Sequence, residues 1–534
     1  MPTANPDSYH PIIYIRGFAM NKSDIDETTA DPFCGFNSGS TVYRARPGVT
    51  EAARFVFESP VVRLVADHDY VNAVSEGMDL SSPTFDEAMP RRSIVIFHYY
   101  DPASTLLGTG VVPPIDEFAR KLSELIARLR DLVLKTNGAY ASAKDFRCLL
   151  VAHSMGGLVA RTFLQNPQCD PMKVRTTVKK LFTYATPHNG IDFGGFNVPS
   201  FFTRHQIDTF NRANMGTYLS LVPTYQTQTD DVARCPATAL DPANIFTLIG
   251  TNRLDYEVGM GLSRTFVGKG SDGLVRIQNA DLKGFTVDEN GTQVDTPCAK
   301  AFVYRSHSGY FGIVNSEEGY QNLQRFLFGD YRVDVWLEIE DVVMPAGALA
   351  NADAAGTLDA KYPVDVIISL RNKRWFLTRR IAEEDSSSVF EHSDLRARRG
   401  QTPPLEKALS TIFMANWGKR DPKNPTVAYR VQLVVRTPDF QISGRDANVD
   451  RFEGSSIYAD AVIVELDTSH VPWTASYWWE SEQTATCDTS TKTPLILQPA
   501  HPGTLSPLVA RIAVEGGSGI EFKGALKFIA SPWA

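Results

Sequence analysis

Short apolar runs alternate with segments of helical periodicity along the first 330 residues of the chain. The apolar runs cover residues 11–15, 93–97, 146–151, 180–184 and 245–249. Runs of this length, bounded by polar residues, are typical of strands that are buried on both faces of a parallel sheet. Between the second and third runs, and before Asn137 and Gly138, apolar residues recur at helical spacing: Phe118, Leu122, Leu125, Leu129 and Leu132. This spacing predicts a crossover helix, so the pattern indicates an α/β fold.

Beyond residue 330 the apolar positions alternate at period two. Two segments have this pattern, with apolar residues at Val333, Val335, Leu337 and Ile339, and at Ile520, Phe522, Leu526 and Phe528. Further strand-like runs cover residues 364–370, 426–435 and 457–466, and the low-complexity stretch 346–355 is predicted to be a loop. Period two with frequent turn residues predicts an all-β domain, most simply a β-sandwich.

The change of pattern also predicts where the chain divides. All seven tryptophans lie from Trp336 onward, and 534 residues exceed what one hydrophobic core usually organises. We therefore predict a catalytic domain over residues 1–330 and a β-rich domain over 331–534. Two stretches of the first domain, 21–90 and 191–243, are longer than ordinary connections in α/β units. The second is rich in aromatic residues, including Phe193, Phe201 and Phe202, and is predicted to cover an apolar substrate pocket as a mobile lid or a fixed cap.

A serine lies where the third apolar run meets a helical segment. The sequence Val151-Ala-His-Ser-Met-Gly-Gly157 places Ser154 between the small residues Ala152 and Gly156. A serine hydroxyl becomes a good nucleophile when it is exposed on a tight strand-to-helix turn, beside a base and the amide donors of a helix N-terminus. Ser154 is therefore a candidate nucleophile, with the amide of Met155 directed at an oxyanion.

This segment resembles the nucleophile elbow of α/β-hydrolases, in the lipase and esterase branch. Residues 185–190, Ala-Thr-Pro-His-Asn-Gly, resemble a stretch near the active-site entrance of those lipases, in which His188 has a structural or entrance-lining place. Residues 270–275, Gly-Ser-Asp-Gly-Leu-Val, resemble the turn that supplies the acid, which implies that Asp272 orients the base. The usual first residue of the elbow is glycine, and here it is alanine.

The resemblance also implies the base and the second oxyanion donor. Triads on this fold run serine, acid, histidine along the chain, and His307 is the histidine between Asp272 and residue 330. It follows a predicted final strand at 301–305 and precedes a predicted helix at 317–328. The loop after the first strand supplies the second oxyanion amide in related lipases, which corresponds here to Phe18. Arg16 stands where those lipases have histidine.

The implied chemistry is two-step acyl transfer through an acyl-enzyme on Ser154. Lipid-like carboxylic esters, including phospholipids, are the favoured substrates. A thioester, an amide or a polyester would use the same triad, and a non-catalytic binding protein on this scaffold is a further alternative. The aromatic residues Trp473, Tyr477, Trp478 and Trp479 are expected to pack a domain core or interface, with contact to a membrane, a glycan or a partner protein as the alternative.

Composition and charge argue against several classes of partner, cofactor and cellular location. A net charge of -8 and a pI near 5.8, without a basic run, argue against nucleic acid as a partner. No apolar stretch reaches the length of a membrane-spanning helix, so at most peripheral contact with a lipid interface is expected. We expect no metal or other cofactor, since no ligand-like cluster is present. The six cysteines lack CxxC spacing, and no export signal precedes residue 10. We therefore expect a cytoplasmic protein, or secretion by a route without a signal peptide.

Overall fold

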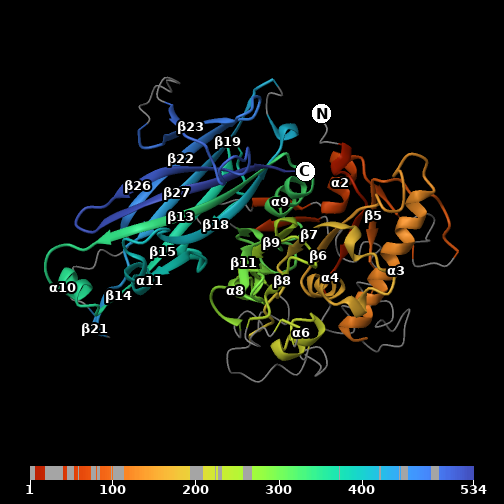
Figure 1. Ribbon diagram of the computed structural model, residues 1–534, viewed down its shortest axis with the longest axis horizontal. Helices are drawn as coiled ribbons and strands as arrows, with labels where there is room; N and C mark the ends of the chain where they lie inside the picture. The colour runs from red at the N-terminus through yellow and green to blue at the C-terminus, as the bar shows by residue number, and fades with distance from the viewer. Residues whose placement is uncertain are drawn as a thin grey trace. The chain divides into compact units, whose positions relative to one another are not determined.

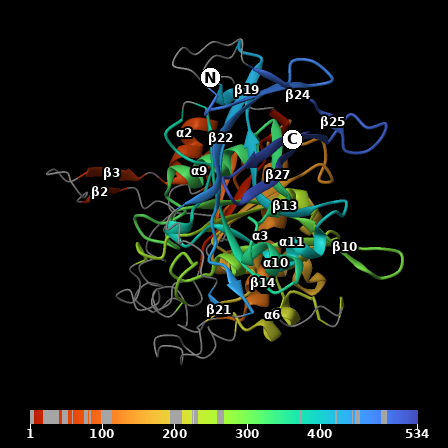
Figure 2. The ribbon, with the colours of Figure 1, turned by 90° about the vertical axis from the view of Figure 1, so that its left-hand side faces the viewer.

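The computed structural model describes most of the chain in two compact units. The described residues are 6–17, 40–44, 53–57, 59–73, 80, 84–97, 99, 113–192, 209–222, 224–225, 231–256, 267–371, 373–419, 423–443, 445–446, 455–482 and 492–533. The N-terminal unit comprises residues 5–300 and 305–327, and the C-terminal unit comprises residues 301–304 and 328–534 together with the first four. Figures 1 and 2 show the two units in perpendicular views.

A seven-stranded sheet organises the N-terminal unit. Its order is β12-β9-β7-β6-β1-β5-β4, and the pairs from β9 to β4 are parallel. The strands are β1 (Ile12–Ile15), β4 (Val71–Asn72), β5 (Ser93–Ile96), β6 (Cys148–His153), β7 (Val178–Tyr184), β9 (Ile245–Gly250) and β12 (Ala299–Val303). The strand order changes direction between β1 and β6, so the carboxyl ends of these two strands form the topological switch point where sites on such sheets lie.

Helices cover both faces of this sheet. The side chains of Ile13, Ile15 and Leu150 pack in one core with α3 (Ile115–Leu134) and α4 (Met155–Gln165), which lie side by side in Figure 1. On the opposite face, Phe182 of β7 contacts Phe326 of α9 (Glu317–Phe328) at 5.9 Å between ring centroids. The continuous burial of β1, β5, β6 and β9 explains why their sequences are uninterrupted apolar runs.

The two predicted insertions contain secondary structure of their own. The first includes the hairpin β2 (Ser40–Arg44) and β3 (Ala53–Phe57), visible at the side of Figure 2, and α2 (Pro60–His68). The second includes α6 (Arg212–Tyr218) and β8 (Arg234–Pro236), and β8 pairs with β10 (Lys283–Val287) beside β11 (Gln293–Pro297). The short helix α8 (Ile277–Ala280) follows the predicted acid turn.

The C-terminal unit is built from two antiparallel sheets around one core, and the predicted fold of this region is confirmed. One sheet has the order β18 (Leu405–Met414), β13 (Tyr331–Val343), β27 (Glu521–Pro532), β26 (Leu508–Gly516) and β25 (Gln498–Pro499). The other has β16 (Thr378–Arg380), β15 (Lys361–Leu370), β19 (Thr426–Arg436), β22 (Ser456–Asp467), β23 (Thr474–Trp479) and β24 (Thr493–Leu495), with β17 (Ser388–Glu391) beside β15. Their inward-facing residues form a single hydrophobic core, as in a β-sandwich.

The remaining elements of this unit are short. A small sheet joins β14 (Leu358–Asp359), β20 (Gln441–Ile442) and β21 (Arg445–Asp446), and α11 (His392–Arg398) follows β17. The prediction of a loop over residues 346–355 is wrong, because α10 (Ala348–Ala354) forms there. Five of its seven residues are alanine or leucine, which have high helix propensity, and Gly347 precedes its first turn.

Candidate active site

The candidate nucleophile lies on a sharp turn between β6 and α4. Ser154 has φ 53° and ψ -126°, a strained conformation for a residue other than glycine. The turn fits because its neighbours are small: a Cβ on Gly156 would clash with the carbonyl oxygen of Ile15 on the adjacent strand β1. The turn therefore projects the Ser154 hydroxyl from the carboxyl edge of the sheet, as the sequence around it predicts.

Three residues that are far apart in the sequence form one hydrogen-bonded relay. The Oγ of Ser154 lies 2.9 Å from Nε2 of His307, and Nδ1 of His307 lies 2.9 Å from Oδ2 of Asp272. Ser154 is 8% exposed, His307 is 3% exposed and Asp272 is 1% exposed. Because Asp272 accepts from Nδ1, the imidazole presents the lone pair of Nε2 to the serine hydroxyl, which is the tautomer that a general base requires.

The carboxylate of Asp272 is fixed independently of the histidine. Its Oδ1 accepts hydrogen bonds from the backbone N–H groups of Leu274 at 3.0 Å and Val275 at 2.7 Å. The backbone N–H of His307 donates to the carbonyl oxygen of Asp272 at 3.0 Å, so the acid and base loops are also joined through their main chains. The tight turn after Asp272 thus satisfies one carboxylate oxygen and leaves the other for the base.

The candidate oxyanion hole is partly within the described residues. Met155 is the first residue of α4, where a backbone N–H has no partner within the helix. Phe18, the predicted second donor, and the predicted pocket residues Phe193, Phe201 and Phe202 lie outside the described part of the chain. The loop that leads to Phe18 passes against the nucleophile, because a Cβ on Gly17 would lie 2.6 Å from the Cβ of Ser154.

Comparisons with known proteins agree with this architecture. A family model described as a PGAP1-like alpha/beta domain matches residues 115–214, a range that includes α3, the serine turn and β7. The N-terminal unit is an α/β-hydrolase domain. The predictions of this fold and of a hydrolytic enzyme are confirmed.

The chain is also similar to solved lipase structures. Lipase BlEst2 of Bacillus licheniformis in its mature form is 12% identical, with 61% of this chain and 94% of that chain covered and a TM-score of 0.29. Phospholipase PlaB from Legionella pneumophila in complex with thio-NAD is 11% identical, with 87% and 90% of the two chains covered and a TM-score of 0.32. A search of curated proteins found no match.

A second histidine of the hydrolase domain lies against the base. His153 directly precedes the nucleophile, and its Nε2 donates to the backbone oxygen of His307 at 2.8 Å. The two rings lie 5.0 Å apart between centroids. Burial, followed by the nearby His307, holds the pKa of His153 well below its usual value, so its imidazole is neutral. The sequence did not single out this residue, although a histidine beside the nucleophile in the Ala-His-Ser-Met-Gly turn could have drawn attention to it.

His188 has the structural place that its motif predicts. It is fully buried, its Nε2 lies 3.1 Å from Oγ1 of Thr183, and burial lowers its pKa strongly. Its carbonyl oxygen accepts from Arg161 of α4, a completely buried cation that also donates to the side chain of Gln165 and to the carbonyl oxygens of Val232 and Arg234. His188 precedes the second insertion and residues 232 and 234 lie near its end, so Arg161 ties both roots of that insertion to α4.

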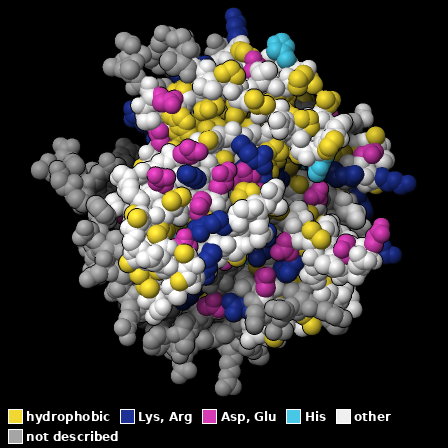
Figure 3. All heavy atoms as spheres, turned by 60° about the vertical axis from the view of Figure 1, so that its left-hand side comes forward, with side chains coloured by type: hydrophobic (Ala, Val, Ile, Leu, Met, Phe, Trp, Pro, Cys, Tyr) yellow, Lys and Arg dark blue, Asp and Glu magenta, His cyan; other side chains and the backbone are white. Residues whose placement is uncertain are grey.

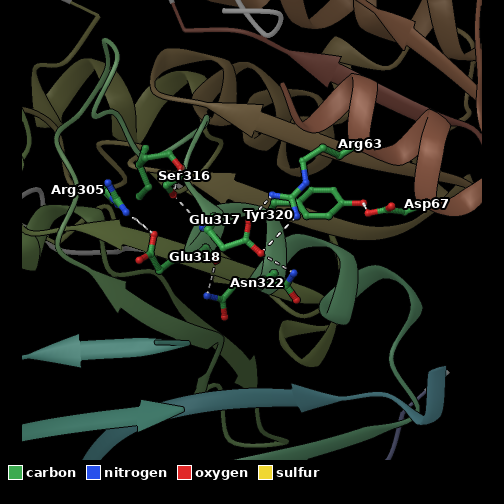
Figure 4. Close-up of polar contacts among 11 residues, drawn as sticks. Arg63, Asp67, Arg305, Ser316, Glu317, Glu318, Tyr320 and Asn322 are labelled. Atoms are coloured by element: carbon green, nitrogen blue, oxygen red, sulfur yellow. Dashed lines mark hydrogen bonds and ion pairs between the residues drawn. The ribbon is translucent and has the colours of Figure 1, made fainter. Parts of the chain in front are cut away.

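Polar contacts hold the segments on both sides of His307 in place, as Figure 4 shows. Arg305, two residues before His307, donates from Nε and Nη2 to Glu318 of α9 at 3.0 and 2.8 Å. Glu317 of the same helix accepts from Arg63 of α2 at 2.7 Å. The guanidinium carbon of Arg63 lies 3.7 Å from the ring centroid of Tyr320, whose hydroxyl donates to Asp67. The loop that carries the base is therefore braced by α9, and α9 by α2.

The described residues contain no cluster of three or more histidine, cysteine, aspartate or glutamate side chains that could hold a metal ion. Four cysteines in this part of the chain, Cys148, Cys169, Cys235 and Cys298, are free and buried. Burial raises the pKa of the Cys235 thiol to about 11, which disfavours a reactive thiolate. No described helix is both long enough and apolar enough to cross a bilayer.

Proposed function

We propose that this enzyme hydrolyses carboxylic esters of lipids through an acyl-enzyme on Ser154. The observation that carries the proposal is the unbroken relay from Ser154 through His307 to Asp272, with both hydrogen bonds at 2.9 Å. Each link has the donor and acceptor that the reaction needs. The strained turn that directs the serine hydroxyl at His307, and the helix amide beside it, support the same chemistry.

The first half of the reaction forms the acyl-enzyme. Nε2 of His307 takes the proton from Ser154 as Oγ bonds to the ester carbonyl carbon, and the carbonyl oxygen becomes an oxyanion near the Met155 amide. When the bond to the leaving oxygen breaks, His307 returns the proton to the departing alcohol. Asp272 accepts from Nδ1 throughout and stabilises the imidazolium form of the base.

The second half releases the acyl group. Water gives a proton to Nε2 of His307 as its oxygen attacks the acyl carbon, and a second oxyanion forms. This intermediate breaks down to the free fatty acid, and Ser154 regains its proton from His307. The chain's own residues thus complete the cycle, and the net reaction adds water across one ester bond.

The preference for lipid esters is supported by apolar side chains on the loops beside the base. Leu254 is 57% exposed, and it lies two residues before Tyr256, whose ring packs edge-on against that of His307 at 5.8 Å. Tyr310, three residues after His307, is 53% exposed. Large apolar groups exposed on both of these loops favour a substrate with hydrocarbon chains over a small polar ester.

Hydrolysis of p-nitrophenyl esters from acetyl to palmitoyl tests the proposal. Ser154→Ala should lower kcat by about 10³-fold or more, whereas Ser142→Ala, which changes an exposed serine on a surface turn, should leave it unchanged. A chain that cleaves no ester but still reacts with a fluorophosphonate at Ser154 would redirect the assignment to an amide, thioester or other specialised acyl donor. Failure of both would overturn the triad.

A further inference from the structure

Two neighbouring segments of the C-terminal unit carry no fixed charge. Residues 468–479 and 493–510 contain no aspartate, glutamate, lysine or arginine, and their only histidines are His470 and His501. The segments are adjacent in space because β23 pairs with β24, with Ala475 opposite Leu495. The second segment then continues into β25 and β26, which pair with each other. Charged residues make up 21% of the whole chain, so two paired charge-free segments form a distinct surface.

Aliphatic side chains project from three separate turns of this surface. Val471 is 74% exposed, Ile496 is 73% exposed and Leu505 is 76% exposed, more than any other large hydrophobic residue in the described part of the chain. Val471 lies between β22 and β23, Ile496 between β24 and β25, and Leu505 between β25 and β26. Such exposure opposes the hydrophobic effect, which favours an interaction that buries these side chains.

Partly buried aromatic rings lie at both ends of β23. Trp473 is half-buried and its ring meets that of Tyr331 at 5.3 Å with an interplanar angle of 89°. Trp479, also half-buried, meets Tyr458 at 6.2 Å. Figure 3 shows hydrophobic side chains gathered in its upper part, with few charged ones among them. The surface therefore presents exposed aliphatic side chains, and one of them, Val471, shares its turn with the half-buried ring of Trp473.

We propose that this surface, formed by residues 468–479 and 493–510, docks the protein on a lipid bilayer. Val471, Ile496 and Leu505 enter the boundary between headgroups and acyl chains, and the Trp473 ring lies at headgroup level, where its amphipathic character is favoured. The absence of charge fits this occupant, since a charged side chain would resist entry into the acyl region. A fluid bilayer accommodates three separate projecting tips, whereas a protein partner would need three matched pockets.

The absence of lysine and arginine also fixes the lipid chemistry. Binding to anionic lipids through basic residues weakens with salt, because the interaction is screened over a Debye length of about 10 Å at 0.1 M. The two segments have no such residues, and the cations over the Trp478 ring, Arg371 and Lys492, are both paired with Glu465. Binding to zwitterionic phosphatidylcholine should therefore be measurable and nearly independent of salt. This docking goes beyond ester hydrolysis, because it holds the enzyme where a lipid substrate is concentrated. It does not involve the catalytic residues.

Sedimentation of the full chain with diether phosphatidylcholine vesicles tests the docking separately from catalysis, because these lipids have no carboxylic ester bond to cleave. The intact chain should bind these vesicles. The bound fraction should be the same at low salt, about 0.05 M, and at high salt, about 0.5 M. Val471→Asp, Ile496→Asp and Leu505→Asp should each weaken binding by about tenfold or more, and the triple variant should abolish it. All variants should hydrolyse p-nitrophenyl acetate at the same rate.

Val389→Asp supplies the matched control, since Val389 is 43% exposed on β17 of the same unit but outside the proposed surface. It should bind vesicles like the intact chain. The proposal is overturned if the intact chain does not bind, if binding requires anionic lipid, or if Val389→Asp weakens it equally. It is also overturned if light scattering finds that the triple variant only dissociates a dimer, because the surface would then join two copies of the chain.

Discussion

The side chain of His153 joins the nucleophile turn to the backbone of the catalytic base. Its Nε2 donates to the carbonyl oxygen of His307 at 2.8 Å, and a Cβ on Gly17 would lie 3.0 Å from its Nδ1. One neutral imidazole thus touches the loop that bears the base and the loop that leads to the oxyanion hole, and it is covalently adjacent to Ser154. It acts as a positioning residue, because it makes no contact with the reacting atoms.

Replacing His153 should therefore slow the reaction without removing the nucleophile. His153→Leu loses the donor to the His307 carbonyl and should lower kcat by about tenfold, with a smaller effect on KM. His153→Gln keeps an amide donor at a similar reach and should recover most of this loss. Labelling of Ser154 by a fluorophosphonate should be slowed more in His153→Leu than in His153→Gln. Equal rates for the two variants would mean that the hydrogen bond does not position the base.

Activity should be sensitive to replacement of Asp272 by asparagine, which has the same shape but no charge. In Asp272→Asn, the amide oxygen would accept the N–H groups of Leu274 and Val275 that now bind Oδ1, which leaves the amide nitrogen facing His307. The histidine would then carry its proton on Nε2 and could not accept one from Ser154. Activity should fall by about 10³- to 10⁴-fold. Circular dichroism and thermal unfolding should match the intact chain, and a stable, fully active variant would contradict the assignment of the acid.

Local motifs made much of the site predictable, because the chemistry imposes short-range patterns. The serine turn needs small neighbours, and the acid turn needs amides that reach the carboxylate. The helix predicted over residues 317–328 is confirmed, since α9 has the same bounds. The C-terminal sandwich followed from period two, since alternate residues of an antiparallel strand face the core.

Other features depend on contacts between distant segments. The role of Arg161 requires carbonyl groups from the two ends of an insertion, and no periodicity reports that they converge. No short motif or periodicity singles out His153, so only the fold reveals its contact with His307. The α10 helix forms where low complexity predicts a loop, because the high alanine content of this stretch favours a helix.

Arg161 should contribute strongly to stability because its burial is complete. Arg161→Met would leave the carbonyl oxygens of His188, Val232 and Arg234 without this donor in a buried environment. We expect the free energy of unfolding of the N-terminal unit to fall by at least about 3 kcal/mol. Arg120→Met provides the control, since Arg120 forms an exposed ion pair with Asp116 and its loss should cost less than about 1 kcal/mol. Urea unfolding compares the two, and similar losses would contradict the special role of Arg161.

Acid should destabilise the N-terminal unit through its buried histidines. Burial, followed by the charge of Lys179, lowers the pKa of His10 to about 3, and burial also lowers the pKa values of His153 and His188 strongly. In the unfolded chain these groups have pKa values near 6.5. Below that pH the unfolded state takes up protons that the folded state does not, so stability is lost as the pH falls, by about 2 kcal/mol per histidine between pH 7 and pH 5.

Urea unfolding at pH 7 and pH 5 measures this dependence, and single variants assign it. His188→Gln should remove about one histidine's share of the difference, because glutamine does not titrate. His501→Gln, which changes an exposed histidine of the C-terminal unit, should leave the difference unchanged. A stability that is flat between the two pH values would mean that the buried imidazoles gain protons in the folded state, which would require the domain to open around them.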